Sequence, residues 1–205
     1  MKRALALIAA LLLSATASAQ GTPAFTELSP PQPLVADDGN KVEVVEFFWY
    51  GCPHCYHIEP LVEKWKKTLP PEAVFRPFPA VFNARWGHDA AIFYAFEALG
   101  VSDKLHRPLF DAIHLDHLRT DDPKALAEWV KSHGIDPKKF DDTMKSFSVQ
   151  AKVRRAAQLT AAYKIDGTPA FAVAGRYTVS AEQGGTQEGM LKNVSYLVEK
   201  LRKGQ

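Results

Sequence analysis

Cysteine is scarce in this chain, since only two of its 205 residues are cysteines and they lie three positions apart, at Cys52 and Cys55. A pair this close in sequence does not cross-link distant segments, so a fold held together by several disulfides is excluded. A zinc finger would need a second Cys/His cluster, which the sequence also lacks. The two sulfurs must therefore be explained together, at one place in the fold.

The chain also lacks an excess of charge of either sign, with 25 basic and 23 acidic residues, which argues against nucleic acid or anionic lipid as a partner. Two basic residues, an apolar run over residues 4–13 and small residues up to Ala19 predict a secretory signal peptide over residues 1–19. The run is too short to span a bilayer, and Gln20 rather than a cysteine follows the expected cleavage site. We therefore expect a soluble exported protein with no stable membrane insertion and no lipid anchor.

Residues 44–57, with the sequence VVEFFWYGCPHCYH, predict a buried strand that turns at Gly51 into a helix. Pro53 suits the first helical turn, where its missing N–H is not needed, so Cys52 is expected at the N-cap. Free backbone N–H groups and the positive end of the helix dipole favour a thiolate at that position. The pattern predicts an acidic, reactive Cys52, with Cys55 one turn further along as the resolving thiol.

Two other interpretations of this turn remain open. A structural disulfide would close a loop of only two residues and would therefore stabilise little. A zinc site would have four possible ligands within six residues, Cys52, His54, Cys55 and His57, but so short a helical run does not easily direct all four to one tetrahedral centre. The redox interpretation is favoured, and it requires no metal or other cofactor beyond the cysteine pair.

The rest of the chain predicts one α/β domain interrupted by helices. The first α/β part is expected over residues 20–83, with a second parallel strand over 73–78 near a sheet edge because of its prolines. A helical insertion is expected over residues 84–160, and the second α/β part over 161–205. Helix signals in the insertion occur near 89–99 and after Ser102, Asp122, Asp136 and Ser148.

Scattered side chains in the insertion carry no clear functional signal. Its histidines show no metal-binding spacing and are interpreted as surface or partly packed residues: His88, His106, His114, His117 and His133. Its large apolar residues recur at helical spacing and are interpreted as core, Phe147 among them.

The run Cys52-Pro53-His54-Cys55, preceded by Glu46-Phe47-Phe48 and joined by Gly167-Thr168-Pro169 at a late strand, resembles the periplasmic disulfide oxidases of the DsbA type. The resemblance covers essentially the whole mature chain. It implies an α/β thioredoxin fold with an inserted all-helical domain, a periplasmic location and the activity of a protein thiol:disulfide oxidoreductase.

The resemblance also implies roles for individual residues. Thr168–Pro169 would be a cis peptide facing the cysteines, and His54 would tune the thiolate, although a histidine at this helical position can also simply face solvent. Glu46 stands in an apolar strand, where a carboxylate is costly unless paired or protonated. By resemblance it lies beneath the disulfide and assists proton movement; the alternative is a side chain that reaches water. The family commonly places a basic residue opposite this acid, but here the matching position is Pro77.

These expectations combine into a mechanism in which Cys52 and Cys55 donate their disulfide to newly exported, reduced proteins. A Cys52 pKa of about 4 would make the pair on the order of 90 mV more oxidising. Substrates would pair with the Thr168 backbone and contact a shallow aromatic surface formed by Trp49, Tyr50, Phe82 and Trp86.

Further expectations concern partners and alternatives. By resemblance, the reoxidant would be a quinone-linked membrane protein of the DsbB type, and we expect a monomer. A disulfide isomerase or reductase of the same fold, and a non-catalytic chaperone or metal-binding module, remain the alternatives.

Overall fold

The computed structural model describes residues 24–36 and 38–204, so the predicted signal peptide lies outside the described residues. The strands are β1 (Thr26–Glu27), β2 (Val42–Phe48), β3 (Ala73–Pro79), β4 (Ala170–Val173) and β5 (Tyr177–Val179). The helices are α1 (Pro53–Trp65), α2 (Ala84–Leu99), α3 (Ser102–His114), α4 (Pro123–Ser132), α5 (Pro137–Lys145), α6 (Phe147–Ala162), α7 (Ala181–Gly184) and α8 (Gln187–Arg202), with a 3₁₀ turn, η1 (Lys66–Thr68), after α1.

Within the described residues, the strands form one mixed sheet in the order β1-β5-β4-β2-β3. Strands β2 and β3 are parallel and the other neighbouring pairs are antiparallel. Because β3 lies at the edge, Pro77 and Pro79 do not interrupt hydrogen bonding between two inner strands. The expected strand–helix–strand unit is therefore confirmed.

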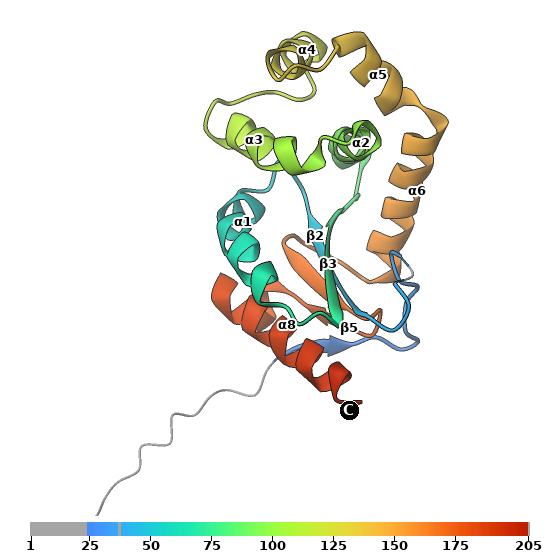
Figure 1. The fold of residues 1–205 in the computed structure, drawn as a ribbon, viewed down its shortest axis with the longest axis vertical. Coiled ribbons are helices and arrows are strands. Elements are labelled where there is room, and N and C mark those ends of the chain that lie inside the picture. The colour runs from blue at the N-terminus through green and yellow to red at the C-terminus, as the bar shows by residue number, and fades with distance from the viewer. Residues whose placement is uncertain (1–23, 37, 205) are drawn as a thin grey trace, which may run out of the picture.

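Strand β2 has helices on both of its faces. All seven of its residues are buried, which explains the nearly continuous apolar pattern. Val42 and Val44 pack in one cluster with α1 and α8, whereas Val45 and Phe47 belong to a second cluster with α6 and the other helices of the insertion. Figure 1 shows α1 and α8 on one side of the sheet and α6 on the other. Glu46 is in phase with Val44, so its side chain points toward α1.

Helices α2 to α6 form an insertion over residues 84–162, called the helical insertion below; α2 to α5 lie beyond one end of the sheet, and α6 runs back along one of its faces (Figure 1). The fold is thus the expected thioredoxin fold with a helical insertion. Helix α2 begins five residues earlier than the sequence pattern predicted at Asp89, because the Asn83 side chain caps it by accepting a hydrogen bond from Trp86 N. Gly100, with φ of 70°, ends the helix in a left-handed conformation. None of the described helices combines the length and apolar character needed to cross a membrane.

Candidate active site

The turn between β2 and α1 brings both cysteines to the end of the sheet that faces the helical insertion. Cys52 is the N-cap of α1 and Pro53 occupies the first turn, as the sequence predicted. The Cys52 N–H donates to Trp49 O at 3.0 Å, which closes the turn. Gly51 is required there, because a Cβ atom at this position would lie within 2.7 Å of the Trp49 indole. The indole therefore lies directly against the backbone that precedes Cys52.

The two cysteines are free thiols with opposite environments. Cys52 Sγ accepts a hydrogen bond from Cys55 N at 3.4 Å, and Cys52 is 7% exposed whereas Cys55 is 1% exposed. Hydrogen bonds from the Cys55 thiol, from Thr168 and from the backbone N–H groups of Cys55 and His54 outweigh burial and lower the pKa of Cys52 to about 5. Burial, reinforced by the Cys52 sulfur, raises the pKa of Cys55 well above its usual value. Cys52 is the thiol that is reactive as an anion at neutral pH.

The loop before β4 forms the other side of the sulfur site. The Thr168–Pro169 peptide bond is cis, as the resemblance implied. When it is protonated, the Cys52 thiol donates to the carbonyl oxygen of Thr168 at 3.3 Å, whereas the Thr168 hydrogen bond that lowers its pKa comes from the Thr168 side chain. Pro169 is buried and Thr168 is partly exposed, so this backbone segment lies at the surface beside Cys52.

Beneath the cysteines lies a buried acidic pair, of which the sequence analysis anticipated only one member. Glu46 is buried, and desolvation, the nearby Glu59 carboxylate and the Cys52 sulfur raise its pKa well above the usual value. The β2–β3 register places Pro77 opposite Glu46, so no basic residue of β3 faces it directly. Both carboxyl groups line an open cleft of about 1070 Å³, which also includes Lys66 among its lining residues.

Glu59 was missed because a glutamate in an amphipathic helix is ordinarily read as a surface residue. It lies on α1 one turn beyond Cys55, and its burial and the nearby Glu63 raise its pKa to about 7. Burial, with the nearby charges of Lys66 and Arg107, lowers the pKa of His106 to about 3, so its imidazole is neutral; His106 Nε2 lies 3.8 Å from Glu59 Oε1. The inner side of the site therefore disfavours charge.

His54 and Pro53 lie on the exposed side of the first helical turn. His54 reaches Cys52 through its backbone N–H, which contributes to the lowered thiol pKa. Its carbonyl accepts a hydrogen bond from Gln187 of α8 at 3.1 Å. The imidazole itself faces solvent.

Three of the four aromatic residues assigned to a substrate surface come together. The Trp49 and Trp86 rings stack with centroids 4.3 Å apart, and the Phe82 ring meets Trp86 edge-on at 4.7 Å. We call Trp49, Trp86 and Phe82 the aromatic ledge. Tyr50 does not belong to it: the residue is buried, and its hydroxyl shares a hydrogen bond of 2.9 Å with His106 Nδ1.

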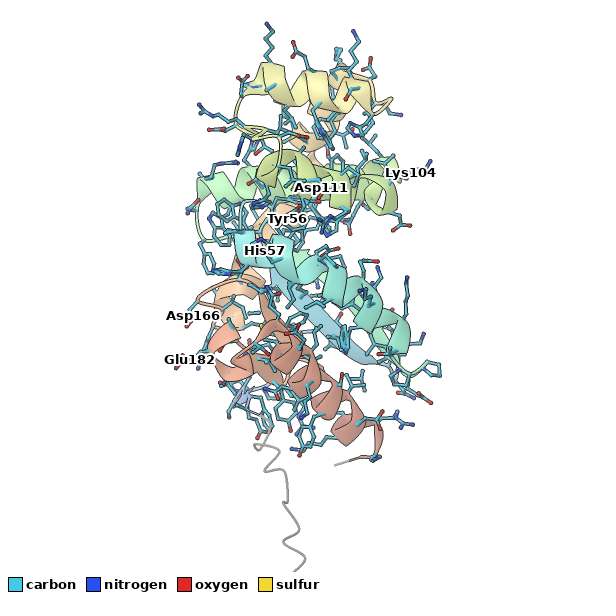
Figure 2. The ribbon with its side chains drawn as sticks, turned by 90° about the vertical axis from the view of Figure 1, so that its left-hand side faces the viewer. Tyr56, His57, Lys104, Asp111, Asp166 and Glu182 are labelled. Carbon is cyan, nitrogen blue, oxygen red and sulfur yellow. The ribbon has the colours of Figure 1, made fainter. Side chains whose placement is uncertain are left out.

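Helix α3 contacts the active-site turn through residues that carried no sequence signal. His114 Nε2 donates to the carbonyl oxygen of Tyr50 at 2.8 Å, and the His114 ring stacks on Tyr56 of α1. Arg107 lies over the same Tyr56 ring, 4.5 Å from its centroid, and pairs with Asp111. Figure 2 shows Tyr56 just below the helix that carries Asp111. Two of the scattered histidines therefore hold the turn through Tyr50: His114 at its carbonyl oxygen and His106 at its hydroxyl.

The zinc interpretation finds no support in the geometry of the turn. His54 and His57 are exposed while the cysteines point inward. Across residues 24–36 and 38–204, no group of three or more His, Cys, Asp or Glu side chains is arranged to hold a metal ion.

An acidic N-cap thiol, a buried partner thiol and an adjacent cis-proline loop on this sheet define a thiol–disulfide oxidoreductase of the thioredoxin fold. Comparisons with known proteins agree. The family described as "DSBA-like thioredoxin domain" matches residues 76–192. The thiol:disulfide interchange protein DsbA of Bordetella parapertussis is 45% identical over 201 residues, covering 98% of this chain and 95% of that protein.

Solved structures give the same result. A crystal structure of Pseudomonas aeruginosa DsbA has a TM-score of 0.81 and 37% identity, covering 88% of this chain and 93% of that one. Reduced DsbA1 from Neisseria meningitidis has a TM-score of 0.74 and 30% identity, with coverages of 88% and 93%. The chain belongs to the DsbA family of protein disulfide oxidoreductases, which act in oxidative protein folding. The resemblance seen in the motifs is confirmed.

Proposed function

We propose that the oxidised Cys52–Cys55 pair donates its disulfide to reduced polypeptides that have been exported to the periplasm. A substrate thiolate attacks Cys52 Sγ, a mixed disulfide forms, and Cys55 leaves with the electron pair of the broken S–S bond and takes up a proton. A second substrate thiolate attacks the substrate sulfur, and Cys52 leaves as a thiolate. Two electrons pass to the protein, which ends as a dithiol, and the substrate gains one disulfide.

The observation that carries this direction is the low pKa of Cys52, about 5, beside a Cys55 of raised pKa. A stable thiolate at pH 7 favours the reduced protein, and hence disulfide donation. Allowing for solvent screening at the mouth of the site, the stabilisation is about 1–3 kcal/mol, or about 20–60 mV. This is less than the 90 mV expected from the motif alone, but it has the same sign.

We assign Glu46 the task of supplying the proton that Cys55 needs as it leaves. Burial and the neighbouring Glu59 raise the pKa of Glu46 and so favour its protonated form, and Glu46 also lines the cleft beneath the site. A carboxyl group whose protonated form is favoured and which lines a cleft can give up a proton and regain one by way of that cleft. The nearby His106 is a poor candidate for this exchange, because its pKa of about 3 keeps it neutral.

Substrate contact is assigned to two surfaces beside Cys52. The Thr168 backbone offers hydrogen bonds to an extended polypeptide at the edge of the cis-proline loop. The aromatic ledge offers an apolar contact, with Phe82 42% exposed at its outer end. His54 faces the solvent from which the substrate arrives, so it can adjust the charge near the mixed disulfide.

The cellular setting follows from the same assignment. A signal peptide over residues 1–19 would deliver the protein to the periplasm, where it would act as a monomer. Its mature chain would consist of the first part of the thioredoxin-like domain over residues 20–83, the helical insertion over 84–160 and the second part of the thioredoxin-like domain over 161–205. Reoxidation would come from a membrane quinone reductase of the DsbB type. The proposal requires no metal or other cofactor, because the disulfide itself is the oxidant.

Equilibration in glutathione redox buffers tests the direction of the reaction. We expect a reduction potential less negative than about −180 mV, the value typical of an isomerase, whereas a value near about −270 mV would indicate a reductase. Thiolate absorbance of the reduced protein gives the second readout. A Cys52 pKa above 7 would contradict the proposal.

A further inference from the structure

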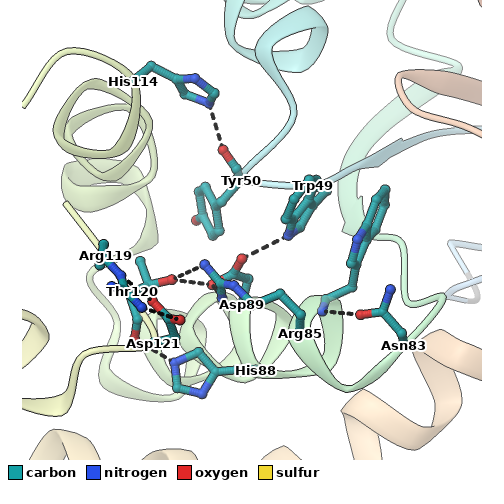
Figure 3. A network of polar contacts seen from close by, with 11 residues as sticks. Trp49, Tyr50, Asn83, Arg85, His88, Asp89, His114, Arg119, Thr120 and Asp121 are labelled. Atoms are coloured by element: carbon teal, nitrogen blue, oxygen red, sulfur yellow. Dashed lines mark hydrogen bonds and ion pairs between the residues drawn. The ribbon is translucent and has the colours of Figure 1, made fainter. Parts of the chain in front are cut away.

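A buried carboxylate of the helical insertion is bonded to the active-site turn. Asp89 lies on α2 and is 1% exposed. Its Oδ2 accepts a hydrogen bond from Trp49 Nε1 at 2.8 Å, and its Oδ1 accepts from Arg85 Nη1 at 2.7 Å and from Thr120 Oγ at 2.6 Å. Figure 3 shows these contacts converging on Asp89. A buried carboxylate is tolerable only when it is satisfied in this way.

All but one of the residues in the hydrogen-bond network around Asp89 belong to the helical insertion. Arg85 also donates to Thr120 Oγ at 2.8 Å, and His88 Nε2 donates to Thr120 O at 2.7 Å. These contacts fix Thr120 against α2, while the ion pair between Asp89 and Arg85, one turn earlier on the same helix, holds the carboxylate in its orientation. Trp49 alone comes from the turn that carries Cys52, so the network links a fixed group in the insertion to a side chain beside the reacting sulfur.

The orientation of the Trp49 indole governs two contacts at once. One is with the backbone at Gly51, which immediately precedes Cys52. The other is the stack with Trp86, in which the two rings are 12° from parallel. An indole that lost its Nε1 partner would be free to rotate about its side-chain bonds, and the ledge would lose its fixed place beside Cys52.

We propose that Asp89 is a positioning residue for polypeptide recognition: acting through Trp49, it holds the aromatic ledge beside Cys52, so that cysteines flanked by apolar residues react faster than small thiols. The inference rests on the proposed function, since it concerns the substrates of that same site. Asp89 touches neither sulfur, so its effect falls on substrates large enough to reach the ledge.

The test compares two reductants of the oxidised protein, glutathione and a peptide whose single cysteine has a leucine on each side. For Asp89→Ala we expect the second-order rate constant with the peptide to fall about tenfold, equivalent to about 1.4 kcal/mol. The rate constant with glutathione should stay within about twofold, because glutathione carries no large apolar side chain for the ledge. The ratio of the two rate constants is a readout that a merely structural role for Asp89 would leave unchanged.

Trp49→Phe removes the Nε1 donor while Asp89 keeps its other two partners, so it tests the same link if Asp89→Ala fails to fold. If Asp89 acts through Trp49, the double variant should lose no more of the peptide-to-glutathione ratio than either single variant. Thr120→Val is the matched control, since it removes one donor to the same carboxylate and leaves the Trp49 bond in place. It should lower stability and preserve the ratio.

Two results would overturn the inference. One is an unchanged ratio in a folded Asp89→Ala or Trp49→Phe protein, and the other is a Thr120→Val ratio that falls as far as that of Asp89→Ala. A wild-type disulfide inert toward both reductants would instead refute the proposed function, which keeps the two failures distinguishable.

Discussion

The outer and inner sides of the active-site turn treat charge in opposite ways, although they are separated by a single turn of α1. On the outer side, hydrogen bonds from the Cys55 thiol, Thr168 and the helix N-terminus hold the pKa of Cys52 at about 5. On the inner side, burial raises the pKa values of Cys55, Glu46 and Glu59. Two chemically identical thiols thus acquire different properties from their positions alone.

This difference assigns each sulfur its step in disulfide exchange. The outer sulfur is a good leaving group because its anion is stable, so the mixed disulfide forms and resolves there. The inner sulfur is unstable as an anion, so it is expected to take up a proton as it leaves and to stay protected from solvent. Disulfide donation should therefore depend on the outer sulfur being stable as an anion and on the inner sulfur being stable as a thiol.

Removing one sulfur at a time is the strongest way to break the comparison. Cys52→Ser should lower the rate of oxidation of a reduced model protein by about 10³-fold or more, because it removes the atom that substrates attack. Cys55→Ser also prevents disulfide donation, but it keeps the outer thiol, which should form stable mixed disulfides with small disulfide reagents. Mass spectrometry of the two variants after such treatment measures the difference.

The matched serine variants control for each other, since each deletes one thiol from the same turn. Equal labelling of both variants at pH 6 would show that the sulfurs do not differ in reactivity. That result would remove the basis for assigning separate steps to them.

Measuring the free energy of unfolding as a function of pH tests whether the inner side of the turn disfavours charge. The folded pKa of Glu59, about 7, lies above the usual value of 4.5, so its contribution to stability is fully present below pH 4.5 and is lost as pH rises through 7. The loss approaches about 3 kcal/mol at pH 8 and above. Glu59→Gln should therefore be more stable than the wild type at pH 8 and should lose less stability between pH 5 and pH 8 in urea unfolding.

Glu182→Gln provides the control, because Glu182 is an exposed glutamate at the start of α7. The stability of the Glu182→Gln variant should change between pH 5 and pH 8 as much as that of the wild type. If Glu59→Gln showed the wild-type slope as well, the carboxyl group of Glu59 would ionise normally and the inner side would not disfavour charge.

The two sides also differ in how far the sequence predicts them. The outer side could be predicted because its signals are local: Pro53 after Cys52 specifies a helix start, and the helix start specifies an acidic thiol. The inner side depends on contacts between distant segments, such as Glu59 with His106, so only Glu46 stood out, as an acid in an apolar strand. Asp89 and Trp49 are likewise 40 residues apart in sequence.

Helix boundaries show the same limit at the level of the fold. Phe147 was assigned to the core from its spacing, and this was wrong, since it is 84% exposed. Ser146 caps α6 immediately before it and places Phe147 in the first turn, on the outer face. A shift of one or two residues in a helix start is enough to turn a side chain from core to solvent.

The smallest effect is expected for Phe82→Ala, at the exposed end of the aromatic ledge. This variant tests whether Phe82 contributes to substrate contact. The Phe82 ring packs edge-on against Trp86, which in turn stacks on Trp49, and much of Phe82 is already exposed. Its removal should slow reaction with the leucine-flanked peptide by about two- to threefold, the range of one aromatic contact at a wet surface, and leave the Cys52 pKa unchanged. Phe147→Ala, which removes an exposed phenylalanine on α6, should change neither quantity. The ledge is proposed to act by contact and not by tuning the thiolate. A Phe82→Ala variant with normal peptide kinetics would therefore restrict the ledge to its two tryptophans. A Phe82→Ala variant with a shifted Cys52 pKa would show that substrate recognition and thiolate stability are not separate properties of the outer side.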